Sequence, residues 1–464
     1  MRRTDAPGFS QRPADWLHVA EAQRRILEGA HPLGGESLSL DQALGRALAR
    51  PLVASATLPP WDNSAMDGYA VRGQDVDGAT PSRPVALKVT AVVRAGGDAG
   101  AFVGSGEAIR IMTGAPLPSG ADTVIRVEDT DGEAAEGTVQ IFDDRDRGRH
   151  IRPAGQDMRA GTTLLEAGHS LTAGSLGVAI AAGAPSVHVH QVPSVAILPT
   201  GDELREPHRY DDVRKGLGVP ESNGTTLSAM TAAIGAVPRH LGIAPDDPAE
   251  LARRIESGSD ADVLITIGGA SMGEADFVKR VLDQAGFELD FWRVKMRPGS
   301  PVSFGWLTYG DRRQAVFGLP GNPSSAFVTF EVFVRPFLLR LAGHRRIFRR
   351  VMTCRAGGRM ETPAELTYFQ RVHLRRQGED TVADLTGPQL SGLVSGLASA
   401  DGLAVIPPET PAVDEGEPVE VMLLDTGPGA LEGQPDALEA RPATEEARPD
   451  AAAAETDRWE PGRR

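Results

Sequence analysis

Two loops rich in Gly and acidic residues each follow an apolar run with the length of a buried strand. The second of them, residues 268–276, contains the pair Gly268 and Gly269, then Ser271 and finally Asp276. Adjacent glycines let backbone amides approach an anion and the serine hydroxyl is a further donor, so this loop is typical of a phosphate site. A carboxylate such as Asp276 repels a phosphate unless a cation such as Mg²⁺ lies between them. The loop therefore suggests metal-assisted chemistry on a phosphate.

Two further carboxylates are candidates to complete such a magnesium site. Glu203 lies in the loop 199–204, after the apolar run 194–198, and Asp246 lies in the segment 244–247. The alternative for each acid is structural, because an acid in the first turn of a helix caps it more often than it binds a ligand. Both interpretations stay open at this point.

A third loop has the size to hold another anion. Residues 318–325 read Gly-Leu-Pro-Gly-Asn-Pro-Ser-Ser, which places Pro323 where a helix starts. Gly321 and Asn322 form the turn, and Ser325 is either a phosphate ligand or only a cap residue. Two such loops at one sheet edge suit a ligand with more than one phosphate.

The segment 292–301 carries three alternating cations, Arg293, Lys295 and Arg297. On a strand, alternate residues share one face, so the three cations are expected on the same side. Two interpretations remain open, namely a local anion site and a solvated strand edge.

Two polar segments in the first half of the chain have no periodic pattern to explain them. Residues 59–70 crowd polar and turn-forming residues around Trp61 and Tyr69, and residues 112–122 are similar. A plain linker does not need such residues, although a simple turn is the alternative for the second segment.

The elements that position these loops follow from hydrophobic patterning between residues 193 and 342. The expected strands lie at 194–198, 263–267 and 316–317, and the expected helices at 223–234, 274–284 and 323–341. Alternation of strand and helix predicts a doubly wound parallel sheet, in which ligands bind beyond the carboxyl ends of the strands.

The rest of the chain has other textures. Helical patterns predict helices at 15–27, 39–48 and 172–182. Alternating segments at 85–93, 108–112 and 123–127 predict a small β-rich domain. Alternation returns at 370–374, 402–406 and 418–424, which predicts a small C-terminal β-barrel.

Composition and charge exclude several classes of protein. The 464 residues include 48 basic and 63 acidic side chains, and a net charge of −15 is the wrong sign for binding nucleic acid or an anionic membrane through the overall field. The single Cys354 excludes an intramolecular disulfide and a Cys-based zinc site and favours a reducing, cytoplasmic location. No run approaches the ~18 apolar residues that span a bilayer, and no signal peptide is expected at the start.

Five motifs occur in a fixed order: Asp62–Ala70, Met112–Ala115, Thr200–Leu204, Gly268–Gly273 and Pro320–Pro323. Each is a weak signal alone, but together they resemble the molybdopterin molybdenumtransferase family, which includes MoeA and gephyrin. The resemblance covers roughly residues 15–425. It implies that the chain inserts molybdate into adenylated molybdopterin, cleaves the pyrophosphate linkage with Mg²⁺ present, and releases AMP and molybdenum cofactor.

The resemblance also implies a multidomain α/β architecture and an elongated homodimer. The expected parts are disordered tails at 1–13 and 426–464, a discontinuous helical dimerisation domain at 14–57 and 147–191, an inserted β-rich domain at 58–146, an α/β molybdopterin-binding domain at 192–345, and a β-barrel domain at 346–425. A molybdopterin adenylyltransferase and molybdoenzyme-maturation proteins are the partners that it implies.

Matched residue by residue, the resemblance implies two sets of functional residues. The catalytic set is Asp67, Thr113, Asp157, Glu203, Asp246 and Asp276, of which Glu203, Asp246 and Asp276 hold Mg²⁺. The substrate-binding set is Arg152, Asn223, Gly268, Gly269, Ser271, Arg293, Lys295, Arg297, Ser300, Gly321, Asn322, Pro323, Ser325, Arg371 and Ser391. Because Asp67, Thr113 and Asp157 lie outside the α/β domain, the site is expected where domains, from both subunits, face each other.

One position departs from the family pattern. Where the family commonly has Lys-Pro-Gly-Lys-Pro, this chain has Arg297–Pro301, with Ser300 in place of the second Lys. Arg297 keeps its charge, whereas Ser300 removes a cation that Lys295 would have to supply. The alternatives to the transferase are a non-catalytic homologue that binds or scaffolds molybdopterin, which Ser300 favours and the retained acids disfavour, and an unrelated hydrolase that shares only the fold.

Overall fold

The computed structural model describes residues 16–97, 100–268, 277–362 and 365–424. These form two compact units, the first of residues up to 348 with 390–393, the second of 349–389 and residues from 394 onward. The two tails expected to be disordered lie outside the described residues. The division into four domains stays a prediction.

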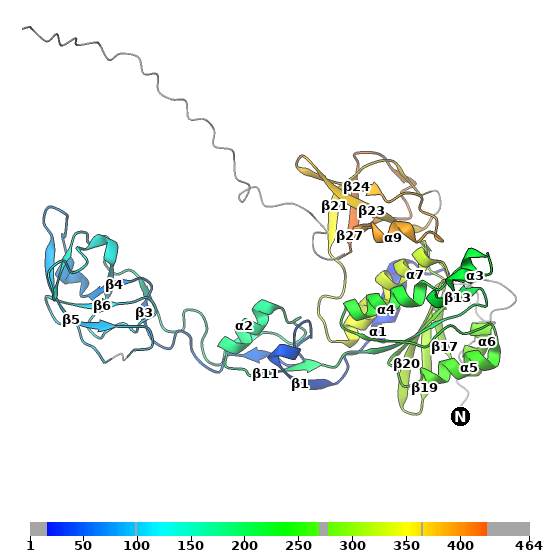
Figure 1. Ribbon diagram of the computed structural model, residues 1–464, viewed down its shortest axis with the longest axis horizontal. Coiled ribbons are helices and arrows are strands. Elements are labelled where there is room, and N and C mark those ends of the chain that lie inside the picture. Colours follow the sequence, from blue (N-terminus) through cyan, green and yellow to red (C-terminus); the bar gives the residue numbers. More distant parts are fainter. Residues whose placement is uncertain (1–15, 98–99, 269–276, 363–364, 425–464) are drawn as a thin grey trace, which may run out of the picture. The chain divides into compact units, whose positions relative to one another are not determined.

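A six-stranded sheet in the order β15-β12-β16-β20-β19-β17 organises the α/β part of the first unit (Figure 1). Its strands are β12 (Ser194–Pro199), β15 (Val237–His240), β16 (Val263–Ile267), β17 (Glu288–Trp292), β19 (Ser303–Tyr309) and β20 (Arg312–Leu319). The first four strands in this order are parallel to one another. β19 then pairs antiparallel with β20, and β17 pairs antiparallel with β19. The predicted doubly wound sheet is confirmed, with an antiparallel edge that the sequence pattern did not indicate.

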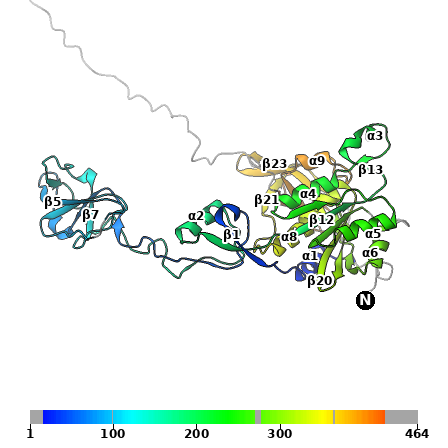
Figure 2. The same cartoon turned by 60° about the horizontal axis from the view of Figure 1, so that its bottom comes forward.

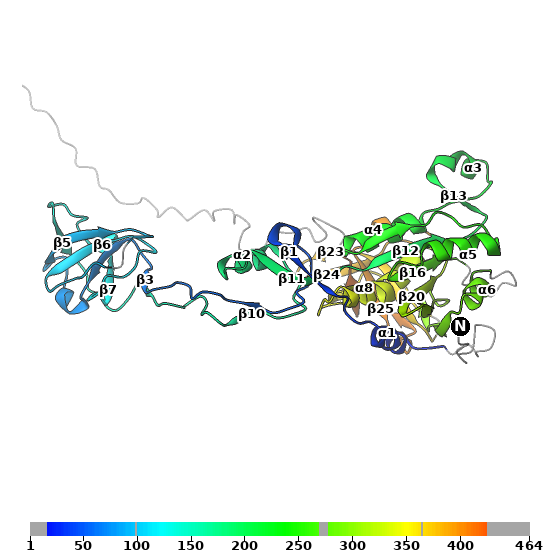
Figure 3. The ribbon, with the colours of Figure 1, turned by 90° about the horizontal axis from the view of Figure 1, so that it is seen from below.

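Helices cover both faces of this sheet (Figures 1 and 3). They are α1 (Val19–Glu28), α4 (Asn223–Ala233), α5 (Pro248–Ser257), α6 (Phe277–Gln284), α7 (Pro323–Thr329), the π-helical segment η5 (Phe330–Val334) and α8 (Arg335–Leu341), whereas α3 (Tyr210–Arg214) packs beside β13 and not on this sheet. Val316 packs in one buried cluster with Leu251 of α5 and Leu282 of α6. The next residue, Phe317, points to the other face, where its ring centroid lies 5.4 Å from that of Phe337 in α8. Two short strands, β13 (Leu204–Arg205) and β14 (Val219–Pro220), pair in parallel beside the 3₁₀ turn η4 (Pro207–Arg209).

Strand pairs join two segments that lie far apart in the sequence. β1 (Gly35–Ser39) pairs antiparallel with β11 (Ser186–His190), and β2 (Leu52–Val53) pairs with β10 (Thr163–Leu165). Between β10 and β11, α2 (Ala173–Ala181) confirms the helical pattern seen there. It begins after Thr172, whose side chain accepts a hydrogen bond from the backbone N of Ser175.

The helix expected at residues 39–48 is not formed, so that prediction is wrong. Leu40–Gln42 make only a 3₁₀ turn, η1, and Gly45 has a φ of +79°. Gly45 N donates to Leu171 O at 2.8 Å and Leu48 N to His169 O at 3.0 Å. Bonds to a distant segment thus replace the helical hydrogen bonds, because tertiary pairing overrides weak local propensity.

A five-stranded sheet in the order β7-β4-β6-β5-β8 forms the predicted β-rich part (Figure 2). Its strands are β4 (Gly68–Val71), β5 (Val85–Val93), β6 (Glu107–Ile111), β7 (Thr123–Arg126) and β8 (Thr138–Ile141), with the 3₁₀ turns η2 (Gly73–Val76) and η3 (Val127–Asp129). Both faces are covered, since Tyr69 and Val71 belong to one buried cluster and Ala70 to another. A short pair, β3 (Asn63–Ser64) and β9 (Ile151–Arg152), adjoins it.

The second unit is the predicted closed β-barrel. Five strands pair in a ring, β23-β24-β21-β27-β25 and back to β23. Their bounds are β21 (Val351–Ala356), β23 (Thr367–Gln377), β24 (Asp380–Leu385), β25 (Gly402–Ile406) and β27 (Pro418–Leu423), with β22 (Met360–Glu361), β26 (Ala412–Val413) and α9 (Ser395–Ala398) beside them. Cys354 is buried in its core. Among the described helices of the whole chain, none has the length and apolarity needed to cross a bilayer.

Candidate functional site

Two loops run side by side at the carboxyl edge of the parallel strands. Ala244 N donates to Pro199 O at 2.9 Å, and Gly201 N donates to Ala244 O at 3.1 Å. A little further along both loops, Asp246 N donates to Asp202 Oδ1 at 3.1 Å. The loop of β12, which carries Asp202 and Glu203, and the loop of β15, which carries Asp246, therefore lie together at this edge.

The carboxylates at this edge repel one another. Burial raises the pKa of Asp246, and the negative charges of Asp202 and Glu203 raise it further. A divalent cation relieves such crowding, and carboxylate oxygens are ligands that Mg²⁺ accepts. No three acidic, His or Cys side chains of the described ranges converge on a metal position. Asp276, the third predicted ligand, lies outside the described residues, so these acids suit Mg²⁺ as part of a larger ligand set.

The loops that follow β16 and β20 approach each other closely. Gly268 has a φ of +102°, and a Cβ there would lie 2.8 Å from Thr200 O; a Cβ on Gly321 would lie 3.6 Å from the Cα of Gly268. Asn223, the first residue of α4, donates its Nδ2 to Gly321 O at 2.7 Å. The predicted residues Gly268, Gly321 and Asn223 are thus neighbours, while Gly269 and Ser271 lie outside the described residues.

The start of α7 gathers the other predicted phosphate ligands. Asn322 is the N-cap residue, with Pro323 in the first helical position. Asn322 Nδ2 donates to Ser391 Oγ at 3.0 Å, and Ser324 N donates to Ser391 O at 3.0 Å. Ser325 is buried, and no hydrogen-bond partner for its hydroxyl occurs in the part of the chain that the structure describes.

The structure does not place Arg293, Lys295 and Arg297 on one strand. β17 ends one residue before Arg293, and only Met296–Arg297 form the next strand, β18. The alternation itself is retained, since Val294 and Met296 are buried while the three cations are not. The segment is therefore extended, but its backbone forms hydrogen bonds with Leu17 near the start of the chain. Leu17 N donates to Arg293 O, and Lys295 N donates to Leu17 O.

The side chains of this basic segment differ in what they contact. The guanidinium carbon of Arg293 lies 4.5 Å from the ring centroid of Trp292 and 5.5 Å from that of Trp16. The hydroxyl of Ser300 donates to the carbonyl of Met296. Ser300 thus closes its own turn and supplies no charge.

Asp67 and Thr113, predicted from separate motifs, are directly bonded. Thr113 donates its backbone N, at 2.7 Å, and its hydroxyl, at 2.9 Å, to Asp67 Oδ1. The backbone bond lowers the pKa of Asp67 most, the hydroxyl bond lowers it further, and the positive charge of Arg110 adds to the effect. Asp67 is therefore ionised at neutral pH.

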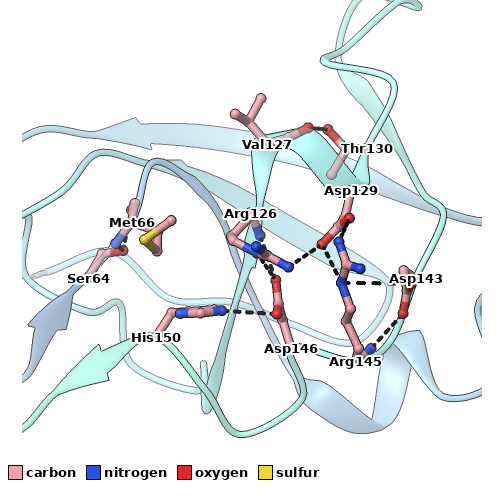
Figure 4. A network of polar contacts seen from close by, with 10 residues as sticks. All are labelled: Ser64, Met66, Arg126, Val127, Asp129, Thr130, Asp143, Arg145, Asp146 and His150. Atoms are coloured by element: carbon pink, nitrogen blue, oxygen red, sulfur yellow. Dashed lines mark hydrogen bonds and ion pairs between the residues drawn. The ribbon is translucent and has the colours of Figure 1, made fainter. Parts of the chain in front are cut away.

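A buried carboxylate anchors the backbone next to Asp67 (Figure 4). Asp146 accepts hydrogen bonds from Arg126 Nε at 2.9 Å and lies 2.9 Å from His150 Nε2. Burial alone would raise the pKa of Asp146, but its bonds to Arg126 and His150 hold it below the ordinary value. Arg126 ends β7, which pairs with β4 directly after Asp67, so this network fixes the strand that presents Asp67.

Arg152 and Asp157 make no contact with the acidic edge in the described ranges. Both are exposed, Arg152 at the end of β9 and Asp157 in the turn that follows. Within the described ranges, no hydrogen bond or ion pair joins either side chain to Glu203 or Asp246. In the second unit, Arg371 is fully buried; it donates Nη2 to Pro388 O at 2.9 Å, and burial lowers its pKa.

Two residues beside the predicted set were missed by sequence reasoning. Asp202 received no role, although it is bonded to Asp246 N. Glu221 is buried, accepts from Gly224 N at 2.6 Å and lies 3.5 Å from His240 Nε2. An acid two residues before a predicted helix is the available signal for Glu221, which caps α4 where it presents Asn223.

The chain matches three family models in order. They are described as the MoeA N-terminal region (domain I and II), over residues 17–183, a probable molybdopterin binding domain, over 196–340, and the MoeA C-terminal region (domain IV), over 353–424.

Individual relatives match over most of their length. Molybdopterin molybdenumtransferase 2 of Mycobacterium tuberculosis (strain ATCC 25618 / H37Rv) is 36% identical over 409 residues, which cover 87% of this chain and 98% of that protein. Molybdopterin molybdenumtransferase of Nostoc sp. (strain PCC 7120 / SAG 25.82 / UTEX 2576) is 35% identical over 398 residues, with 84% and 88% covered. The crystal structure of the molybdopterin biosynthesis MoeA protein of Pyrococcus horikoshii OT3 is 26% identical, with a TM-score of 0.76 over 88% of this chain and 100% of that one. By sequence and by fold, this chain belongs to the molybdopterin molybdenumtransferase (MoeA) family.

Proposed function

We propose that this chain is a molybdenum cofactor biosynthesis enzyme that inserts molybdate into adenylated molybdopterin and releases AMP and molybdenum cofactor. The observation that carries the proposal is the carboxylate edge of Asp202, Glu203 and Asp246, beside the Gly268 and Gly321 loops. It combines a cation-seeking cluster with backbone that a phosphate can approach. The names of the relatives support the same reaction.

The roles of the residues follow from their surroundings. Glu203, Asp246 and Asp276 would hold Mg²⁺, and that ion would polarise the pyrophosphate linkage. A cation would favour the ionised form of Asp246, which burial and the charges of Asp202 and Glu203 disfavour. Lys295 and Arg297 would hold oxyanions, since their charges lie on the unburied side of an extended segment.

The assembly is also part of this proposal. A homodimer would let Asp67 and Thr113 of one subunit complete the site at Asp246 of the other. Such an enzyme would work in the cytoplasm, receive adenylated molybdopterin from an adenylyltransferase and pass the cofactor to maturation proteins. A non-catalytic molybdopterin-binding homologue is the second candidate, because Ser300 uses its hydroxyl within its own turn.

The proposal is tested by molybdate-dependent AMP release from adenylated molybdopterin with purified protein. Asp246→Asn is expected to lower the rate about 100-fold, the scale of losing one electrostatic group from a site. Asp247→Asn is the matched control, because Asp247 accepts from Glu250 N at 2.8 Å as the cap of α5, a role that Asn retains. Binding of substrate without AMP release would support the non-catalytic candidate, and AMP release that ignores molybdate would indicate a hydrolase.

A further inference from the structure

A pocket of about 460 Å³ opens in the first unit beside α8, at the opposite end of α4 from the acidic edge. Asn223 begins α4, whereas Ala232 and Ala233 line the pocket. At 1.5 Å per residue the two ends of α4 lie about 15 Å apart. The pocket is therefore separate from the candidate site.

The polar side chains of this pocket are basic. Arg46, Arg335, Arg346 and His344 line it, and no acidic residue is among the described residues that do. Arg46 pairs with Glu36, and Arg335 lies 3.8 Å from Glu331, so these two cations are partly neutralised from outside the pocket. Arg346 has no acidic partner within the described ranges, and the Nε of Arg46 is buried with no hydrogen-bond partner there. Arg346 therefore gives the pocket a positive charge that no described acid offsets.

The pKa of His344, a buried residue that lines the pocket, reflects the charges around it. The residue is 8% exposed, and its Nδ1 lies 2.6 Å from Ser170 Oγ, while no partner for Nε2 occurs among the described residues. Burial first, and then the nearby Arg335, His190 and Arg46, lower the pKa of His344 to about 4. Every neighbour that shifts this pKa is basic and none is acidic, so the surroundings of the imidazole disfavour a further positive charge.

Helix capping does not account for these basic residues. Arginines at helix ends often bind the last carbonyls, but backbone amides already do so here. Gly235 N donates to Ala232 O at 2.9 Å at the end of α4, and Gly343 N donates to Arg340 O at 3.0 Å at the end of α8. Arg46 Nη2 donates to His190 O at 2.6 Å and Arg335 Nη1 donates to Ile347 O at 2.9 Å, so Arg346 and His344 Nε2 are the groups left to meet a ligand.

Backbone bonds hold the walls of the pocket in place. Arg345 N donates to Gly168 O at 3.0 Å, and Leu33 N donates to Leu341 O at 2.8 Å. The other walls are apolar, with Leu44, Val192, Ile234 and Leu339 beside the cations. A ligand that fits both surfaces has an anionic head and a compact organic body.

We propose that this pocket is a second anion site, which binds the oxyanion head of a small organic phosphate or carboxylate and packs the organic body against its apolar wall. The head would contact Arg346 and His344 Nε2. Ligand binding would favour the imidazolium form of His344, so affinity rises as the pH falls. This site does not depend on the proposed transferase activity.

The test uses the full chain labelled at the histidine Cε1 and titrated with phenyl phosphate, benzoate and the neutral analogue benzyl alcohol. The His344 resonance, identified with His344→Asn, is expected to shift with one or both anions and to titrate at higher pH when they are bound. Phenyl phosphate without benzoate identifies a phosphate ligand, and the reverse a carboxylate. No shift with either anion, or an equal affinity for benzyl alcohol, overturns the proposal.

A pair of neighbouring arginines supplies the matched variants. Arg346→Ala, an exposed residue that lines the pocket, is expected to weaken binding roughly tenfold, or about 1.4 kcal/mol. Arg345→Ala removes the same charge one residue away, from a side chain that packs on Gly168 instead, and is expected to leave binding unchanged. Equal losses in both variants would show a general charge effect and contradict the site.

Discussion

Thr113 holds Asp67 through two donors that meet on one carboxylate oxygen, the backbone N at 2.7 Å and the hydroxyl at 2.9 Å. The backbone bond survives any substitution at residue 113 other than proline, whereas the side-chain bond needs a hydroxyl. The two contributions can therefore be separated.

Thr113→Val removes the hydroxyl with little change of shape. The pKa of Asp67 is expected to rise toward its ordinary value, but the carboxyl stays ionised at pH 7, because the backbone donor remains. AMP release at pH 7 should fall roughly tenfold through lost positioning of the carboxylate. Carboxyl ¹³C titration and the activity assay check the two effects, and Thr113→Ser should restore both. A wild-type rate for Thr113→Val would remove Thr113 from the site.

Mixed dimers test whether each site is shared between subunits. Asp67→Asn and Asp246→Asn are each expected to lose about 100-fold in activity alone. An equimolar, randomly reassociated mixture should recover about a quarter of wild-type activity, because half of the dimers then carry one site with neither substitution. If all catalytic residues of a site came from one subunit, every site in the mixture would carry a substitution and no activity would return.

Gly268 and Gly321 differ in what a side chain would meet. Gly268→Ala places a Cβ 2.8 Å from Thr200 O at a φ of +102°, and should cost about 1–3 kcal/mol of unfolding free energy. Gly321→Ala meets only the Cα of Gly268 at 3.6 Å, an ordinary contact, and should cost less than about 1 kcal/mol. Urea unfolding followed by circular dichroism measures both. Equal costs would mean that the loop relaxes.

Glu221 gives the fold a defined sensitivity to acid. Burial would raise its pKa, but the contact with His240 and the bond from Gly224 N lower it below the ordinary 4.5. A lowered carboxyl pKa stabilises the folded state above pH 4.5, and this contribution is lost as the pH falls through the folded-state value. Glu221→Gln should lower Tm near pH 6 but flatten its fall below pH 4.5. A parallel shift of Tm at all pH values would show that ionisation is not involved.

Ser300→Lys restores the cation that the family commonly has at this position. The added charge should lower the KM for molybdate a few-fold, on the scale of an exposed ion pair, and the effect should shrink with added salt. Ser300→Gln, of similar length but uncharged, is the control, since both substitutions remove the hydroxyl that donates to Met296. An equal KM for the two variants would show that Lys295 and Arg297 already suffice.

The α/β sheet could be predicted because its strands are continuous apolar runs, such as Val263–Ile267, between recognisable helices. The hydrophobic pattern at 39–48 predicts a helix that does not form. Apolar residues at helical spacing can also be buried by a segment whose backbone hydrogen bonds go to a distant part of the chain. Ala43 and Leu48 are buried as a helix would bury them, yet Gly45 bonds to Leu171.

The candidate site was predicted unevenly for a similar reason. Acids at strand ends, such as Glu203, follow from topology, since parallel strands end at one edge. The pairing of Asp67 with Thr113 required the family resemblance, because 46 residues separate them. Glu221 was missed, because its structural role depends on contacts with His240 and Gly224 that sequence spacing does not reveal.

The π-helical segment Phe330–Val334 links two parts of one helix that face different neighbours. At the start of the whole helix, Asn322 donates a hydrogen bond to Ser391. Beyond the π-helical segment, the ring centroid of Phe337 lies 5.9 Å from that of Phe304 and 5.4 Å from that of Phe317. Each residue of an α-helix turns the chain by about 100°. The π-helical segment has a wider turn, so it sets the rotation of the end that carries Phe337 relative to the end that carries Asn322. Removing one residue here would make the helix regular but swing Phe337 off its aromatic partners. A side-chain substitution in this segment keeps that rotation, whereas a change of its length does not.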